Sequence, residues 1–342
     1  MQKKHCLTLI IGSLIGLVIL SLLPPKEHLY TELIVNAQNN VDLSDLSIFY
    51  TDINYNQIKP YSLDDNGLSP IHKKFVPYTE GFIPKNTYTT YKNALTKEIG
   101  PLSKGLQNYY ETDDYVFLAF PGDLTQLQVI HQDSLEVYNL EIDEDIPLKP
   151  MYTAHMKQIG NTLILLAGEA RNYNALIYTI DLSSLKVTGA KHLKTHPTAL
   201  DTPHYTLTEK GMALFIAGDQ LQVYNPFTDT ESFIDLPFKA SGVVAKGQTI
   251  CVYSQGNDTL DYVLLDGTLN LVTTQTVSIP SSSYVLVDLE VKDNLLYVAT
   301  LDPSGLLFKN YISIYNLNTG MMQYCLGLGD AAPLALVDLS LF

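Results

Sequence analysis

The chain has 342 residues, a formal net charge of −15 and 46% hydrophobic residues. So acidic a chain lacks the excess of Lys and Arg that binds phosphate backbones and anionic lipid surfaces, which excludes nucleic-acid binding and flat adsorption on acidic membranes. Three cysteines are too few for a disulfide scaffold. The length allows a sizeable core and one to three domains.

The amino terminus has the composition of a membrane anchor. Residues 7–23 contain no charged residue and twelve Leu, Ile or Val. These twelve side chains favour insertion into a bilayer by about 4–7 kcal/mol. Lys3 and Lys4 precede the run, so the positive-inside rule keeps the N-terminus cytoplasmic and exports the rest. We therefore expect a single-pass cell-membrane protein whose body is extracytoplasmic.

A cleaved signal peptide is the alternative interpretation of this segment. The small-residue pattern before Gln38 would place the cut after Ala37, and the protein would then be secreted. The apolar run is longer than a usual signal-peptide core, so the anchor is preferred. The predicted organisation is an anchor over residues 1–25, a linker over residues 26–44 and one domain over residues 45–342.

The most informative internal pattern is a repeated phrase of Val or Ile, then Tyr, then a polar turn. It occurs as VYNL, IYTI, VYNP and IYNL, at steps of 40, 46 and 91 residues. A period in the forties is typical of the four-stranded blade of a propeller. We assign each phrase to the third strand of its blade. The four occurrences lie at 137–140, 177–180, 223–226 and 314–317.

A second pattern supports the first. Short turns with Gly, Asp or Asn precede continuous apolar runs at 161–167, 211–217, 247–253 and 293–299. Such runs, bounded by turns, are typical of strands that are buried on both faces. Further turns are predicted at Asp181–Ser184, Asp266–Gly267 and Asn318–Gly320, between the Tyr-bearing strand and the outer strand.

The two ends of the domain complement each other. Residues 333–339 supply one strand and residues 46–63 supply the next two, so the last strand is expected to pair with the first unit and close the ring. Closure removes the open sheet edges on which other chains could pair. The predicted fold is thus an all-β, six-bladed propeller after one transmembrane helix. Its blades are residues 45–75 with 333–342, then 106–142, 150–192, 203–236, 239–279 and 284–328.

Residues 76–105 fit this scheme least well. They show no clean apolar strand, and we interpret them as an insertion with a short helix near 92–99. The stretch is long enough for one more unit. Seven blades therefore remain an alternative.

The repeating unit resembles that of the broad β-propeller superfamily, with its WD40-like and YVTN-like repeats. The resemblance covers nearly all of residues 45–342 and identifies no particular family. Trp-dependent repeat motifs are excluded because the chain has no Trp. The superfamily includes hydrolases, lyases and binding scaffolds, so the resemblance implies an architecture and no activity.

Propeller ligands usually bind where the loop after the second strand meets the connection between blades. We expect binding residues there because a rigid scaffold positions such loops. Solvated loop chemistry is the simpler explanation for each residue taken alone. The candidates for hydrogen bonding or stacking to a sugar or peptide are Arg171, Tyr173, Asn257, Asp258, Asp302 and Lys309.

One inter-blade connection contains a candidate metal site. His196, Asp201 and His204 lie within nine residues, and imidazole with carboxylate could bind zinc or a similar ion. Their spacing matches no established metal motif. Ordinary polar-loop chemistry is the competing interpretation.

The leading functional hypothesis is a binding or scaffold module, anchored in the membrane through residues 7–23. Its partner would be a protein or an envelope glycan outside the membrane. The alternative is an exported hydrolase or lyase that acts on sugars or peptides at the central channel. No catalytic motif or cofactor motif is present, so an enzyme is the less favoured reading and no cofactor is expected. Cys251 and Cys325 lie in apolar strands and are expected to be buried, inert thiols.

Overall fold

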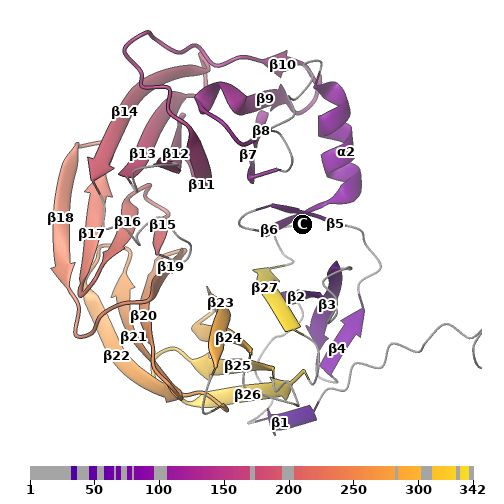
Figure 1. Cartoon of the computed structure of the whole chain (residues 1–342), viewed down its shortest axis with the longest axis vertical. Coiled ribbons are helices and arrows are strands. Elements are labelled where there is room, and N and C mark those ends of the chain that lie inside the picture. Colours follow the sequence, from indigo (N-terminus) through magenta and orange to yellow (C-terminus); the bar gives the residue numbers. More distant parts are fainter. Residues whose placement is uncertain are drawn as a thin grey trace, which may run out of the picture.

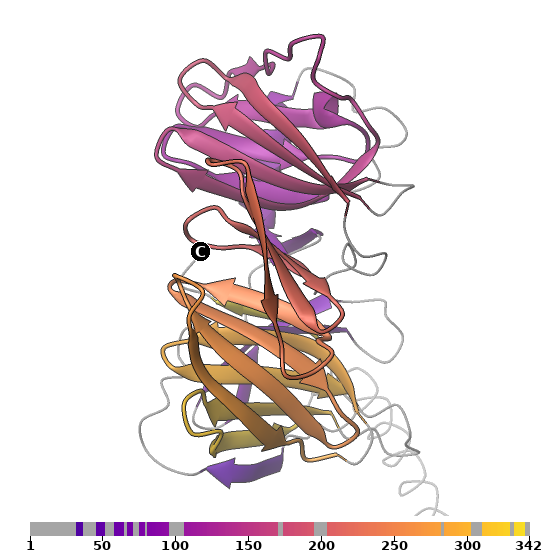
Figure 2. The same ribbon diagram turned by 90° about the vertical axis from the view of Figure 1, so that its left-hand side faces the viewer.

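The computed structural model describes twelve stretches of the chain, and within them the protein is all-β except for short helical pieces. The sheets lie around a common centre (Figure 1), with successive sheets facing one another in the side view (Figure 2). The described residues are 32–36, 46–51, 58–64, 67–70, 75–78, 81–95, 106–169, 174–194, 204–281, 284–301, 310–328 and 332–338.

Five sheets are four-stranded and antiparallel, and a sixth has five strands. Four of them consist of strands that are consecutive in the sequence. The first sheet consists of β7 (Asn108–Glu111), β8 (Tyr115–Ala119), β9 (Leu127–His131) and β10 (Val137–Tyr138), with a 3-10 turn at Leu124–Gln126; the second consists of β11 (Met151–Ile159), β12 (Thr162–Glu169), β13 (Asn174–Asp181) and β14 (Lys186–Lys194). The third sheet consists of β15 (Tyr205–Leu207), β16 (Ala213–Ala217), β17 (Gln220–Asn225) and β18 (Thr230–Asp235). The fourth sheet consists of β19 (Gly242–Lys246), β20 (Thr249–Gln255), β21 (Thr259–Asp266) and β22 (Leu271–Ser278).

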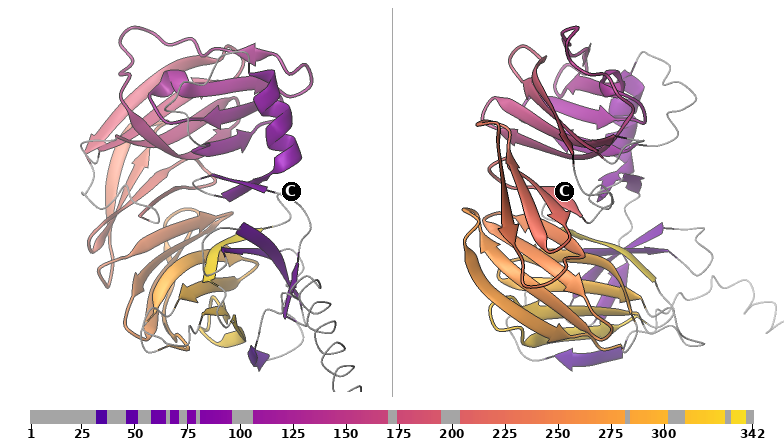
Figure 3. Two further views of the ribbon diagram at one scale, coloured as in Figure 1. Left: turned by 45° about the vertical axis from the view of Figure 1, so that its right-hand side comes forward. Right: turned by 60° about the vertical axis from the view of Figure 1, so that its left-hand side comes forward.

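Two further sheets combine strands from distant parts of the sequence. The carboxy-terminal strand joins the amino-terminal hairpin, and the amino-terminal strand joins the last unit (Figure 3). In the β2–β4 sheet, β27 (Ala332–Asp338) pairs with β2 (Leu46–Thr51), which is followed by β3 (Ile58–Asp64) and β4 (Gly67–Pro70). The last sheet consists of β23 (Val285–Lys292), β24 (Leu295–Leu301), β25 (Tyr311–Asn316) and β26 (Met322–Gly327), with β1 (Glu32–Asn36) on its outer edge.

The core is divided among the interfaces between neighbouring sheets. One cluster joins Leu166 and Ile177 of the second sheet to Phe215 of the third, and the next joins Leu214 to Val252 of the fourth. The second strand β12 is accordingly buried without interruption from Leu163 to Gly168, whereas the outer strand β18 is almost entirely exposed. This arrangement of sheets is that of a β-propeller.

The expected turns are present and have the predicted chemistry. Gly160 and Gly247 adopt left-handed backbone angles, with φ of 57° and 56°, at the turns that precede β12 and β20. The equivalent turn before β24 uses Asn294, with φ of 66°, because Asn tolerates this conformation better than most residues. In the turn before β14, the Asp181 carboxylate accepts hydrogen bonds from the backbone and side chain of Ser184.

The Tyr phrases are not all equivalent. Tyr178, Tyr224 and Tyr315 lie on third strands and are buried, as expected. Tyr138, in contrast, lies on the fourth strand of its sheet and is 37% exposed. Assigning it to a third strand was wrong, because the third strand there is β9 (LQVIH), which contains no Tyr.

The stretch around residues 76–105 also differs from expectation. It contains a hairpin of β5 (Phe75–Tyr78) and β6 (Gly81–Pro84), followed by α2 (Lys85–Ala94). The helix thus lies earlier than the expected position near 92–99. These elements lie between the β2–β4 sheet and the β7–β10 sheet (Figure 1), and Tyr88 and Tyr91 pack on the cluster around Ile83.

The pairing of the two chain ends has a defined register. β27 runs antiparallel to β2, with Leu46 opposite Asp338 and Ser47 opposite Val337. β27 also contacts the inner strand β23 of the last sheet. Within the described residues no helix is long and apolar enough to cross a bilayer, and the predicted span at 7–23 lies outside them.

Candidate functional site

The structure describes three of the nine residues singled out from the sequence. Asn257 and Asp258 are exposed in the connection between β20 and β21, where the Asp258 carbonyl accepts a hydrogen bond from the Ile279 amide. His204 is half-buried just before β15, and its carbonyl accepts a hydrogen bond from the Ile216 amide. The other six lie outside the described residues: Arg171, Tyr173, His196, Asp201, Asp302 and Lys309.

The structure does not bring the three described candidates into one site. His204 belongs to the third sheet, whereas Asn257 and Asp258 belong to the fourth. The described residues contain no group of three or more His, Cys, Asp or Glu side chains that could hold a metal ion. The proposed metal site stays untested, because His196 and Asp201 lie outside that range.

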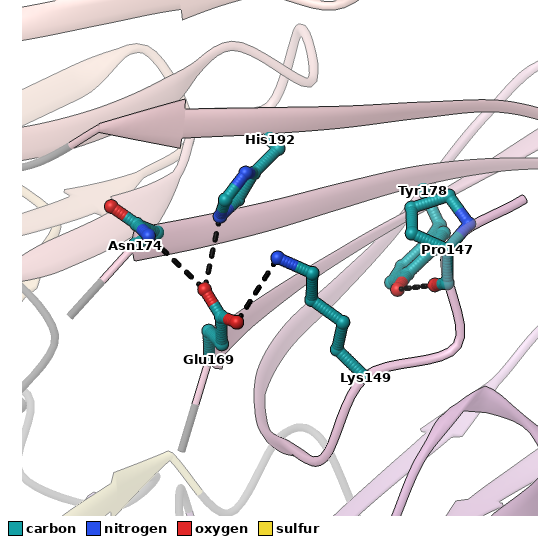
Figure 4. Close-up of polar contacts among 6 residues, drawn as sticks. All are labelled: Pro147, Lys149, Glu169, Asn174, Tyr178 and His192. Carbon is teal, nitrogen blue, oxygen red and sulfur yellow. Dashed lines mark hydrogen bonds and ion pairs between the residues drawn. The ribbon is translucent and has the colours of Figure 1, made fainter. Parts of the chain in front are cut away.

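A polar cluster that sequence reasoning missed lies at one end of the second sheet (Figure 4). Glu169 accepts three interactions at 3.0 Å: from the Lys149 ammonium, from Nε2 of His192 and from the Asn174 amide. We call these four residues the Glu169 cluster. It surrounds the two ends of the loop that contains Arg171 and Tyr173.

The strand register explains how the Glu169 cluster forms. Glu169 ends β12 and Asn174 begins β13, so both lie where the chain leaves and re-enters the sheet. His192 pairs with Leu176 near the end of β14, and Lys149 precedes β11. Antiparallel pairing places all four at the same end of the sheet. At this same end the chain leaves the second strand, enters the sheet at β11 and leaves it after β14.

The electrostatics of the cluster determine what chemistry it can perform. Partial burial alone would raise the pKa of Glu169, but hydrogen bonds from Asn174, Lys149 and His192 lower it to about 2. The carboxylate is therefore ionised at neutral pH and occupied by donors. A group in that state is a poor general acid or base, because efficient proton transfer needs a pKa near the working pH.

The cluster is suited to binding. The Glu169 side chain is only 9% exposed, whereas those of Lys149 and His192 are 34% and 40% exposed. A nearly buried anion thus fixes two donor side chains that still face water. Such donors can bind the hydroxyls of a sugar, or a carboxylate or carbonyl of a peptide. Nearby, the Tyr178 hydroxyl donates to the Pro147 carbonyl at 2.8 Å and fixes the segment before Lys149.

Among the described carboxyl groups, Asp288 has the clearest upward pKa shift, and it lies where β23 of the last sheet contacts β27. Asp288, on the inner strand β23, has a pKa raised to about 6, chiefly by burial. Its carboxylate accepts hydrogen bonds from the backbone amides of Leu336 on β27, at 2.6 Å, and of Leu289. The neighbouring Glu290 is paired with Lys246 at 2.7 Å. The Asp288–Leu336 hydrogen bond ties the last sheet to β27, the strand that completes the β2–β4 sheet, and the Lys246–Glu290 ion pair ties the last sheet to the fourth. Both roles are structural.

In the acidic stretch at 141–145, Glu141 and Asp143 are both paired with one lysine. Lys186 lies 3.0 Å from both Glu141 and Asp143, at the opposite end of the second sheet from the Glu169 cluster. Cys251 and Cys325 are unpaired and buried, as expected, and burial raises the pKa of both thiols. Neither feature indicates catalysis.

Comparison with known proteins identifies no family for the chain. No family model matches it, and no curated protein does. Solved structures to which the chain is similar include YCF48 bound to D1 peptide, at 11% identity and a TM-score of 0.46, with 85% of each chain covered. Another is the dihydro-heme d1 dehydrogenase NirN in complex with DHE, at 12% identity and a TM-score of 0.43, with 92% of this chain and 83% of the other covered. TolB from Acinetobacter baumannii is another (13%, 0.42, 86% and 68%). At these identities and TM-scores the likenesses carry no argument about activity, and the function has to be argued from the chain itself.

Proposed function

We propose that this protein is a membrane-anchored, extracytoplasmic β-propeller of six blades, closed by its carboxy-terminal strand, that binds a protein or envelope glycan. The observation that carries the proposal is the Glu169 cluster. It presents the exposed donors of Lys149 and His192 at the blade end where propeller ligands usually bind, on a carboxylate that is held ionised. That combination favours recognition over proton-transfer chemistry.

The pairing of β1 supports retention of the amino-terminal segment. β1 lies antiparallel to β26, with Leu33 opposite Leu326 and Val35 opposite Cys325. A cut after Ala37 would remove this strand and expose the edge of the last sheet. An uncleaved anchor keeps β1 in place. The eight residues between the apolar run and Glu32 span at most about 28 Å, so the last sheet would lie near the membrane.

A capture experiment with matched variants tests the binding role. The full chain, purified in mild detergent, is immobilised and exposed to membrane and wall extracts, and retained proteins and glycans are quantified. Lys149→Ala removes a donor of the Glu169 cluster. Lys186→Ala is the control, because its side chain has the same 34% exposure and also makes 3.0 Å ion pairs, at the opposite end of the same sheet.

The proposal expects a reproducible partner whose retention falls at least tenfold with Lys149→Ala and stays within twofold with Lys186→Ala. Equal retention by both variants would show that the Glu169 cluster is not part of the binding site. Failure of the unmodified chain to retain anything reproducibly would overturn the binding role itself. Carbonate extraction of native membranes tests anchorage separately, since an anchored chain stays in the pellet and a secreted one does not.

A further inference from the structure

The outer strands of the sheets differ in how their free edges are protected. An edge strand presents unpaired N–H and C=O groups, and charged side chains usually prevent other strands from pairing there. β14 carries Lys186, Lys191 and Lys194, and β18 carries Glu231 and Asp235. β26 has no charged residue, but β1 covers it.

β22 has neither protection within the described residues. Its sequence, LVTTQTVS, contains no charge and no Pro over eight residues, and it is the last strand of its sheet. Leu271 and Val272 are 65% and 56% exposed, which are high values for aliphatic side chains in a strand. In the view of Figure 2 the outer strands β14, β18 and β22 face the reader, so this edge lies on the outside of the ring.

Contacts with the last sheet also hold β22 in place. Gln275 donates to the Asn318 carbonyl of the last sheet at 2.7 Å, and Val277 is buried. β22 pairs with β21 along almost its whole length. A fixed, extended edge of this length needs little ordering before another strand can pair with it, which favours strand addition.

The chain itself shows what kind of segment such an edge accepts. The equally uncharged edge of β26 is covered by ELIVN, an antiparallel strand with three consecutive aliphatic residues. We propose that the free edge of β22 is a second strand-acceptor site, which binds an extended aliphatic segment of a partner protein in antiparallel orientation. A second copy of this chain is disfavoured as occupant, because two bodies of net charge −15 repel each other. The site is separate from the Glu169 cluster, and it does not depend on membrane anchorage.

The test uses a fluorescent peptide with the sequence of residues 31–37, TELIVNA, as the strand probe for the full chain. A peptide with Pro in place of its Ile is the negative control, since it cannot continue a strand ladder. Binding is followed by anisotropy, and hydrogen exchange locates the protected amides. Thr274→Lys places a charge on the exposed face of β22, and Ser232→Lys places one on the exposed strand β18 as the matched control.

The proposal expects exchange at residues 271–278 to slow at least fivefold with the probe. Thr274→Lys should weaken binding at least tenfold, and Ser232→Lys by less than twofold. Protection confined to β26 would mean that the probe only displaces β1. That result, or no protection of β22 at millimolar peptide, overturns the proposal. If, without the peptide, the protection of β22 rises with protein concentration, the edge binds a second copy of the chain, and this result also overturns the proposal.

Discussion

Replacing Tyr262 with Phe should weaken the contact between the fourth sheet and the last sheet. The Tyr262 hydroxyl donates to the Leu317 carbonyl at 2.8 Å, and both residues are buried, at 0% and 2% exposure. Phe keeps the ring and its packing, so the change removes one donor and leaves a buried acceptor without it. Such a loss costs about 1–3 kcal/mol. The free energy of unfolding should fall by that amount.

Urea unfolding, followed by far-UV circular dichroism, measures the effect as a shift of the midpoint at constant slope. Tyr138→Phe is the control, because Tyr138 is 37% exposed and its hydroxyl bonds Glu136 at the surface. It should change stability by less than about 0.5 kcal/mol. Tyr315→Phe breaks the reciprocal bond to the Ser278 carbonyl across the same interface and should also destabilise the protein. Equal effects of Tyr262→Phe and Tyr138→Phe would refute the inter-sheet role of the buried hydroxyl.

Three further predictions concern titratable groups. Because the pKa of Glu169 is lowered from 4.5 to about 2, its ion pairs stabilise the protein fully above about pH 4.5, and that contribution is lost as the pH falls toward 2. Glu169→Gln should therefore melt below wild type at pH 7 and converge with it near pH 2, and a difference independent of pH contradicts this. Asp288 should change the stability in the opposite direction, because burial raises its pKa from 3.8 to about 6. The wild type should therefore lose stability as the pH rises from about 4 to 6. Thermal melts of Asp288→Asn should lack this fall in melting temperature with pH. In a chain with Cys6 replaced by Ser, the thiols of Cys251 and Cys325, whose pKa values burial raises, should react with Ellman's reagent only after unfolding. Rapid labelling of that chain in its native state would show an error in the core.

Much of the architecture could be predicted from the sequence because buried strands have a simple signature. A strand packed on both faces is an uninterrupted apolar run, and the runs predicted at 161–167, 211–217, 247–253 and 293–299 contain most of β12, β16, β20 and β24. The β5–β6 hairpin was missed, since Pro77 and Pro84 argue against strands in a sequence pattern. Tyr138 was misplaced because Val-Tyr followed by a polar residue suits a fourth strand as well as a third.

The candidate site was harder to foresee. Lys149, Glu169 and His192 are separated by twenty residues or more, and only the register of β11–β14 brings them together. The loop between Glu169 and Asn174 was identified as a binding segment, yet the ion pairs at its two ends were not. One sequence signal was present: Glu169 is a charged residue that ends an apolar strand, directly before a polar loop. Asp288 gave no such signal, because its partner is a backbone amide.

The completion of the amino-terminal sheet by the carboxy-terminal strand is the claim on which the closed propeller rests, and a disulfide trap tests it most directly. Ser47 and Val337 lie opposite each other in β2 and β27, and opposed residues of antiparallel strands are about 4.5–5.5 Å apart at Cα, within disulfide range. In a chain with Cys6 replaced by Ser, the Ser47→Cys, Val337→Cys double variant should oxidise to an intramolecular disulfide and run faster on a non-reducing gel. Its unfolding midpoint should match or exceed that of the reduced form. Single variants are the control. Failure of the folded double variant to form this disulfide, or crosslinking only between molecules, would contradict the closure.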